Sequence, residues 1–76
     1  METAIYRSYF NGYYTFIHEE GEITYEEIEP TLLRVYDLKN DHSLIGKTFE
    51  IGYTEVITDD QLDFVIFRIT HLNLVD

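Results

Sequence analysis

The chain has no cysteine and no tryptophan, and it has only one proline and four glycines among 76 residues. Without cysteine there is no disulfide and no thiolate metal site, so a domain this small depends on its apolar side chains for stability. The lack of cysteine also fits a reducing compartment. Glu2 and Thr3 follow Met1 in place of a basic stretch and an apolar core, and no apolar run approaches a membrane span in length. We therefore expect no signal peptide, no membrane association and a cytoplasmic location.

Basic residues are also scarce: five lysines and arginines stand against fifteen aspartates and glutamates, for a formal net charge of −10. Proteins bind phosphate backbones by releasing counterions to lysine and arginine. The few here are scattered along the chain, at Arg7, Arg34, Lys39, Lys47 and Arg68. We therefore expect no direct binding of nucleic acid or of an anionic membrane, and we expect the partner to present a basic protein surface.

The length suits a single domain over residues 1–76. Folding at this length buries only about 60% of the unfolded surface, which leaves a thin core. Seven tyrosines and five phenylalanines compensate, because aromatic side chains bury the most area per residue.

The most specific local signal is Asn11-Gly12 between two β-prone runs, residues 4–10 and 13–18. Asn-Gly supplies the two positive φ values of a type I′ turn, so the pattern predicts a β-hairpin. Alternation along the second strand places on one face Tyr14, Phe16 and His18. Both faces are largely apolar or aromatic, so the strand is expected to be covered on both sides or to carry an exposed aromatic patch.

After a second turn at residues 19–22, we expect a short third strand at 23–25 and then a helix. Pro30 decides where the helix begins. In a helix interior proline costs about 3 kcal/mol, whereas it is favoured at the first helical position. We therefore expect a short helix at residues 30–38.

Two long strands complete the chain. Residues 47–57 alternate between apolar and polar, which predicts a half-buried strand, and Gly52 within it is typical of a bulge or bend. A turn at 58–61 leads to a final strand at 63–75. Apolar residues occupy odd-numbered positions at first, at Val65, Phe67 and Ile69, and even-numbered positions later, at Leu72 and Leu74. This change of phase predicts a bulge near Thr70 or His71.

The order of elements is strand, strand, short strand, helix, long strand and long bent strand, which predicts a mainly β fold with one short helix. Two architectures accommodate it. A small five-stranded barrel with the helix between its third and fourth strands resembles the OB-fold in element order. An α+β antiparallel sheet with one helix on a face uses the same elements without closing. We favour the barrel, because closure removes exposed sheet edges.

His18, Glu19 and Glu20 combine imidazole and carboxylate groups, which bind transition metals. They lie at a strand end, however, where alternation sends neighbouring side chains to opposite faces, and they lack the helical spacing of a zinc motif. We expect a solvated hairpin turn here, with no metal and no cofactor.

Nucleophilic catalysis requires an activated side chain beside a positioned base. Ser8 and Ser43 are the only serines, and His42 directly precedes Ser43, where adjacent residues seldom form the required hydrogen bond. We therefore expect that the protein is not an enzyme and has no catalytic residues.

Residues 19–29 hold six carboxylates among eleven residues. As a recognition surface, they would steer a basic partner while apolar side chains among them provide desolvated anchors. The predicted partner-binding residues in this stretch are Glu19, Glu20, Glu22, Tyr25, Glu26, Glu27 and Glu29. A second predicted surface beside the Asn11-Gly12 turn consists of Tyr9, Tyr13 and Tyr14. A solvated turn and ordinary hairpin packing remain the structural alternatives for the two sets.

These features predict a non-enzymatic protein-interaction module with an acidic surface, such as an inhibitor of a basic or nucleic-acid-binding protein. One alternative is a β-barrel that binds a small ligand or an oligosaccharide on an aromatic face. Another is an oligomerisation or accessory domain whose aromatic hairpin pairs with a second copy. The sequence leaves the oligomeric state open, and a homodimer is one of the states it allows.

Overall fold

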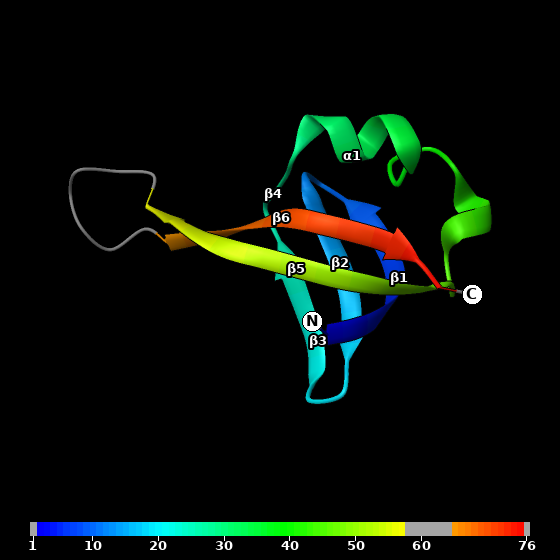
Figure 1. Ribbon diagram of the computed structural model, residues 1–76, viewed down its shortest axis with the longest axis horizontal. Coiled ribbons are helices and arrows are strands. Elements are labelled where there is room, and N and C mark those ends of the chain that lie inside the picture. The colour runs from blue at the N-terminus through cyan, green and yellow to red at the C-terminus, as the bar shows by residue number, and fades with distance from the viewer. Residues whose placement is uncertain (1, 58–64, 76) are drawn as a thin grey trace.

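The computed structural model describes residues 2–57 and 65–75 (Figure 1). Its elements are β1 (Glu2–Phe10), β2 (Tyr13–His18), β3 (Gly21–Tyr25), β4 (Glu27–Ile28), α1 (Pro30–Val35), a 3-10 helix (His42–Leu44), β5 (Thr48–Ile57) and β6 (Val65–Leu74). The fold is therefore mainly β with one short helix, as predicted. The predicted turn at 58–61 lies outside the described residues. Within the part of the chain that the structure describes, no helix is long and apolar enough to cross a membrane.

The strands form one six-stranded sheet in the order β3-β2-β1-β5-β6-β4. Neighbouring strands are antiparallel except β4, which runs parallel to β6. The sheet is mixed and open, so it fits the predicted five-stranded barrel only loosely, and it is not the purely antiparallel sheet of the alternative. The physical reason lies in the segment 21–28, which pairs first with β2 and then, beyond Glu26, with β6.

Glu26 makes this change of partner by bonding to β6 twice. Its amide donates to the Phe67 carbonyl at 3.1 Å, and its Oε1 accepts from the Phe67 amide at 2.9 Å. The carboxylate thus takes the place of a backbone acceptor, which satisfies a strand amide that the bend would otherwise leave unpaired.

The predicted hairpin between β1 and β2 is confirmed. Asn11 and Gly12 have φ values of 53° and 88°, the two positive angles that a type I′ turn needs. The side chains of β2 alternate as predicted, and the buried ones are Tyr14, Phe16 and His18.

β5 and β6 form a long hairpin that extends beyond the rest of the sheet (Figure 1). Gly52 pairs with His71 and Tyr53 with Ile69, so Thr70 is the extra residue of a bulge. The bulge is where the change of phase predicted it, and Gly52 lies opposite.

α1 begins at Pro30 as predicted, but it ends at Val35 rather than at residue 38. Tyr36 ends it by taking an extended conformation, with φ −125° and ψ 106°. The turn of the chain there lets the Tyr36 hydroxyl accept a hydrogen bond from the Leu74 amide at 3.0 Å. A contact to the last strand therefore replaces the last turn of the expected helix.

Aromatic rings fill the core between the sheet and α1. Phe16 has no exposed surface, and its ring centroid lies 5.2 Å from that of Tyr6, 5.9 Å from that of Tyr25 and 6.1 Å from that of Phe49. These tilted and edge-on arrangements are the favourable ones for aromatic pairs. The other buried apolar residues are Ala4, Tyr14, Ile28, Leu38, Leu44, Ile51, Ile69 and Leu72.

Candidate functional site

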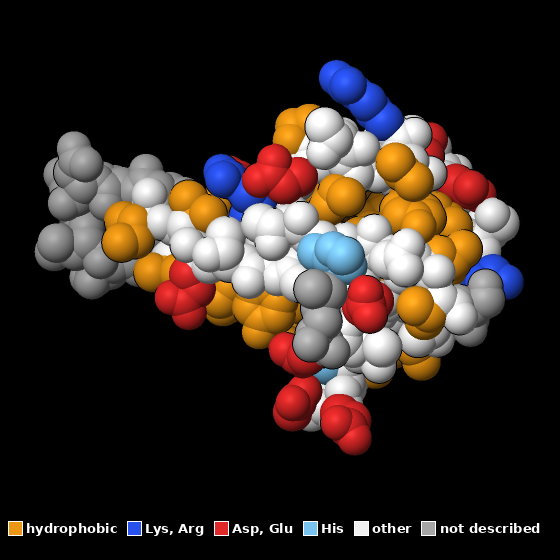
Figure 2. Space-filling model, in the orientation of Figure 1, with side chains coloured by type: hydrophobic (Ala, Val, Ile, Leu, Met, Phe, Trp, Pro, Cys, Tyr) orange, Lys and Arg blue, Asp and Glu red, His pale blue; other side chains and the backbone are white. Residues whose placement is uncertain are grey.

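The end of the molecule that carries the β2–β3 turn is acidic (Figure 2). On the face shown, acidic side chains gather at this end with no lysine or arginine beside them. Two hollows occur here, one of about 510 Å³ and one of about 670 Å³, and both include Glu2. Their lining residues are Glu2, Thr3, Glu19, Glu20, Ile51, Gly52, Tyr53, Thr54 and Glu55. We call these nine residues the acidic concavity.

Four carboxylates of the acidic concavity, and no basic side chain among its described residues, give it a negative potential. The local folding explains how they gather. Gly21 has a φ of 133° and pairs with His18 across the turn, so Glu19 and Glu20 form the tip. Glu2 is the first residue of β1 and lies on the same face of this strand as the buried Ala4 and Tyr6. Since β1 pairs antiparallel with β2, this position is beside the end of β2.

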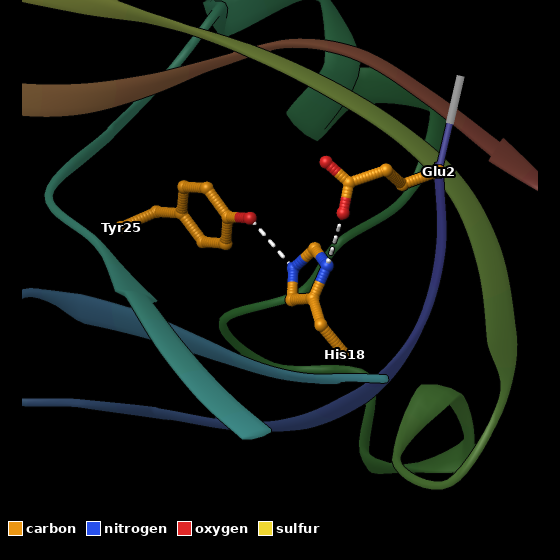
Figure 3. A network of polar contacts seen from close by, with 3 residues as sticks. All are labelled: Glu2, His18 and Tyr25. Carbon is orange, nitrogen blue, oxygen red and sulfur yellow. Dashed lines mark hydrogen bonds and ion pairs between the residues drawn. The ribbon is translucent and has the colours of Figure 1, made fainter. Parts of the chain in front are cut away.

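His18 is the buried polar residue of the site, and its side chain has no exposed surface. Its Nδ1 lies 3.2 Å from Glu2 Oε1 and its Nε2 lies 2.7 Å from the Tyr25 hydroxyl (Figure 3). A carboxylate accepts, so Nδ1 donates to Glu2, and Nε2 of the neutral ring then accepts from Tyr25. Both ring nitrogens therefore have a hydrogen-bond partner, so the buried imidazole leaves no polar atom unpaired.

Tyr25 supports His18 from within the core. Its ring has no exposed surface and stands 5.1 Å from the ring of Tyr53 and 6.4 Å from that of Phe67. Burial raises the pKa of the Tyr25 hydroxyl, and the nearby Tyr53, Glu2 and Glu20 raise it further. A hydroxyl that is buried and protonated does not act as a nucleophile on an outside substrate.

One group of side chains in the described residues has the composition and spacing of a metal site. Glu2, His18 and Glu20 each offer one ligand atom, and these atoms lie within 4.8 Å of one another. The sequence places His18, Glu19 and Glu20 at the end of a strand, and it predicts a solvated turn with no metal there. That prediction did not include Glu2, which comes from another strand.

The predicted acidic set is divided by the fold. Glu19 and Glu20 line the acidic concavity, whereas other members are engaged within the molecule. Glu22 Oε2 pairs with Arg7 at 2.5 Å, and Glu27 Oε1 pairs with Arg68 at 2.6 Å.

The remaining members of that set have separate positions. Glu26 bonds to β6 as described above, and Glu29 precedes α1. Tyr25 is a core residue, so it does not provide the surface anchor that the sequence predicted. It shares the inner face of β3 with Ile23, opposite the exposed Thr24, and its ring packs against Phe16.

The predicted tyrosine surface is reduced in the same way. Tyr14 is buried, and Tyr9 is half-buried with its ring 4.8 Å from that of Tyr14 and 5.5 Å from Lys39 Nζ. Tyr13 is exposed, and its partner across the hairpin, Phe10, is 77% exposed. Sequence reasoning missed Phe10, although its place beside the Asn11-Gly12 turn is the relevant signal.

Sequence reasoning also missed seven of the nine residues of the acidic concavity, among them Glu2, Tyr53 and Glu55. The parity of Glu2 with Ala4 and Tyr6 is a signal for its inward position. For Tyr53 and Glu55 the sequence offers none, because their exposure follows from the extension of the β5–β6 hairpin beyond the body of the sheet.

No protein-family model matches the chain. No curated protein and no solved structure is found to be similar to it either.

Proposed function

We propose that this protein is a non-enzymatic interaction module that binds a basic segment of another protein in the acidic concavity. The observation that carries the proposal is the gathering of four carboxylates, from three separate parts of the chain, around hollows lined by no described lysine or arginine. Charges arranged in this way steer a cationic partner and raise its association rate.

Tyr53 supports a contact as well as steering. It lines the same hollow as Glu2 and Glu55 and is about one-third exposed, so part of its side chain is open to a partner. Lysine and arginine side chains bind aromatic faces by cation–π attraction, and arginine adds stacking. A short basic segment is therefore the ligand whose chemistry fits both the charge and the ring.

Two of the basic residues that could neutralise the surface are already paired. Arg7 and Arg68 bond to Glu22 and Glu27 respectively, and none of these four residues lines the acidic concavity. Four carboxylates of the described residues remain for a partner in the acidic concavity. Inhibition of a nucleic-acid-binding protein, by occupying its basic surface, is the form of this function that the net charge favours.

The test compares two double variants that lose the same charge. Glu19→Gln with Glu55→Gln alters the acidic concavity, whereas Glu29→Gln with Asp37→Asn alters exposed or partly exposed positions elsewhere. Each protein is titrated with a fluorescent peptide rich in lysine and arginine, at low and at about 0.5 M salt. We expect the first pair to weaken binding at least about tenfold and the second pair less than about threefold, with high salt weakening all binding.

Equal weakening by the two pairs would show that net charge alone attracts the peptide, and it would refute a located site. Binding that is insensitive to salt would refute steering. The same variants, used as bait in a lysate, then identify the partners whose capture depends on the acidic concavity.

The alternative functions have less support. Binding of a small ligand on an aromatic face requires open aromatic surface, whereas most described aromatic side chains of the inner face fill the core. An OB-like barrel is the fold that this alternative function would use. One feature supports such a barrel: the segment 21–28 contains both edge strands of the sheet, β3 and β4. Self-association through the exposed pair Phe10 and Tyr13 has to overcome repulsion between two chains of charge −10.

A further inference from the structure

We propose that Glu2, His18 and Glu20 bind a divalent transition-metal ion, with Zn²⁺ as the ion that fits best. The sequence alone predicted no metal here. The inference is independent of the proposed function, because it rests on donor geometry at one corner of the acidic concavity and not on its overall charge.

The distance between two of the donor atoms matches the edge of a tetrahedral site. Zinc binds imidazole nitrogen and carboxylate oxygen at about 2.1 Å, so two ligand atoms of a tetrahedral site lie about 3.4 Å apart. His18 Nδ1 and Glu2 Oε1 are already 3.2 Å apart. Glu20 contributes the third ligand atom of a group whose three atoms lie within 4.8 Å of one another, and its side chain is exposed at a turn, where it is free to approach the ion.

The hydrogen bond between Nε2 and Tyr25 orients the His18 ring so that Nδ1 faces Glu2. Metal-bound histidines use one ring nitrogen for the ion and the other to donate to an oxygen of the surrounding protein. The Tyr25 oxygen lies 2.7 Å from Nε2 and serves as that acceptor (Figure 3). On binding, the ring proton moves from Nδ1 to Nε2, the Tyr25 hydroxyl changes from donor to acceptor, and the ion takes the place of the Nδ1–H between the imidazole and Glu2.

The ligand set selects the class of ion. One imidazole nitrogen with two carboxylate oxygens favours Zn²⁺ and its neighbours in the first transition row, whereas Ca²⁺ and Mg²⁺ prefer ligand sets made of oxygen alone. The hollow between Glu2, Thr3, Glu19 and Glu20 provides the path of entry and leaves the fourth position of the ion to water. Three protein ligands and one open position allow exchange with solvent, so we expect reversible binding.

The decisive experiment is calorimetric titration of the full chain with Zn²⁺ and, separately, with Mg²⁺. We expect a one-to-one complex with Zn²⁺ and at least about tenfold weaker binding of Mg²⁺. Glu20→Gln and Glu2→Gln should each weaken Zn²⁺ binding at least about tenfold, because each removes a ligand. Glu19→Gln is the matched control, since it removes the same charge from the same turn but no ligand, and it should change the affinity less than about twofold.

A readout at His18 avoids replacing a buried residue. In nitrogen-15 NMR spectra, Zn²⁺ should shift the Nδ1 resonance of His18 and convert the ring to the Nε2–H form. Equal effects of Glu19→Gln and Glu20→Gln on Zn²⁺ affinity would show that the ion is attracted only by the general negative charge, and they would overturn the proposal. Unchanged His18 resonances at saturating Zn²⁺ would also overturn it. The two proposals fail separately, because Glu19→Gln belongs to the variant that disrupts peptide binding but leaves metal binding intact.

Discussion

Removing the hydroxyl of Tyr6 should reveal how β1 is tied to the chain that follows α1. Tyr6 is almost fully buried, and its hydroxyl donates to the Leu38 carbonyl at 2.6 Å, across 32 residues of sequence. Tyr6→Phe keeps the ring and deletes this donor. The Leu38 carbonyl, itself in the core region, loses that partner.

At neutral pH the substitution should cost about 1 to 2 kcal/mol of unfolding free energy. A buried neutral hydrogen bond contributes about 1 kcal/mol, and an acceptor left without its partner adds to the loss. The substitution preserves the packing of the ring against Phe16, whose centroid is 5.2 Å away. The cavity it leaves is no larger than one oxygen atom, so the loss of packing adds little to the cost.

The difference between the two proteins should shrink at alkaline pH. Burial raises the pKa of Tyr6 from 10.0 to about 12, and the neighbouring Tyr14 and Tyr9 add to the rise. Because the folded state holds this proton more tightly than the unfolded chain, the contribution is complete below pH 10 and is lost as the pH rises through 12. The wild-type protein should lose roughly 1 kcal/mol from this group by pH 11 and roughly 2 kcal/mol by pH 12, so the two stabilities should meet near pH 11.

The assay is urea unfolding followed by circular dichroism, at intervals from pH 7 to pH 12, for wild type, Tyr6→Phe and the control Tyr13→Phe. Tyr13 is 44% exposed, so its hydroxyl should be dispensable at neutral pH. A Tyr6→Phe protein as stable as wild type at pH 7 would refute the role of the Leu38 bond. A gap that stays constant up to pH 12 would refute the raised pKa.

Two further substitutions test the fold. Ile51 and Ile57 lie on the same face of β5, but they are 1% and 72% exposed. In urea unfolding, Ile51→Ala should therefore cost about 2 to 5 kcal/mol and Ile57→Ala less than about 0.5 kcal/mol. Similar losses at both positions would mean that the side chain of Ile57 is packed. Gly12 has a φ of 88° with no atom within 4 Å of an added Cβ, so Gly12→Ala should cost about 1 kcal/mol through backbone strain alone. An unchanged unfolding midpoint for Gly12→Ala would show that the turn does not depend on the positive angle.

Much of the local structure follows from residues that are close in sequence. The Asn11-Gly12 turn, the start of α1 at Pro30 and the bulge at Thr70 all depend on backbone angles or on side-chain periodicity, which a few consecutive residues specify. Predictions failed where a distant partner competes. α1 ends early because Tyr36 bonds to β6, and Tyr25 turns inward because the core takes its ring.

The candidate site was visible only in part. His18, Glu19 and Glu20 are adjacent in the chain and could be recognised as a combination of imidazole and carboxylates. Glu2 could be matched to them only once the register of β1 against β2 was known, because register depends on the whole hairpin and on the face that is buried.

Composition alone determined that this chain carries a large negative charge without disulfides and that an aromatic core has to stabilise it. Tertiary structure decided which carboxylates are consumed in internal bonds, as at Glu22 and Glu27, and which face a hollow beside a buried imidazole. The physical reason is that a charge count is additive along a chain. The free energy of each charge instead depends on what lies within a few ångströms of it, and only the pairing of strands brings those neighbours together.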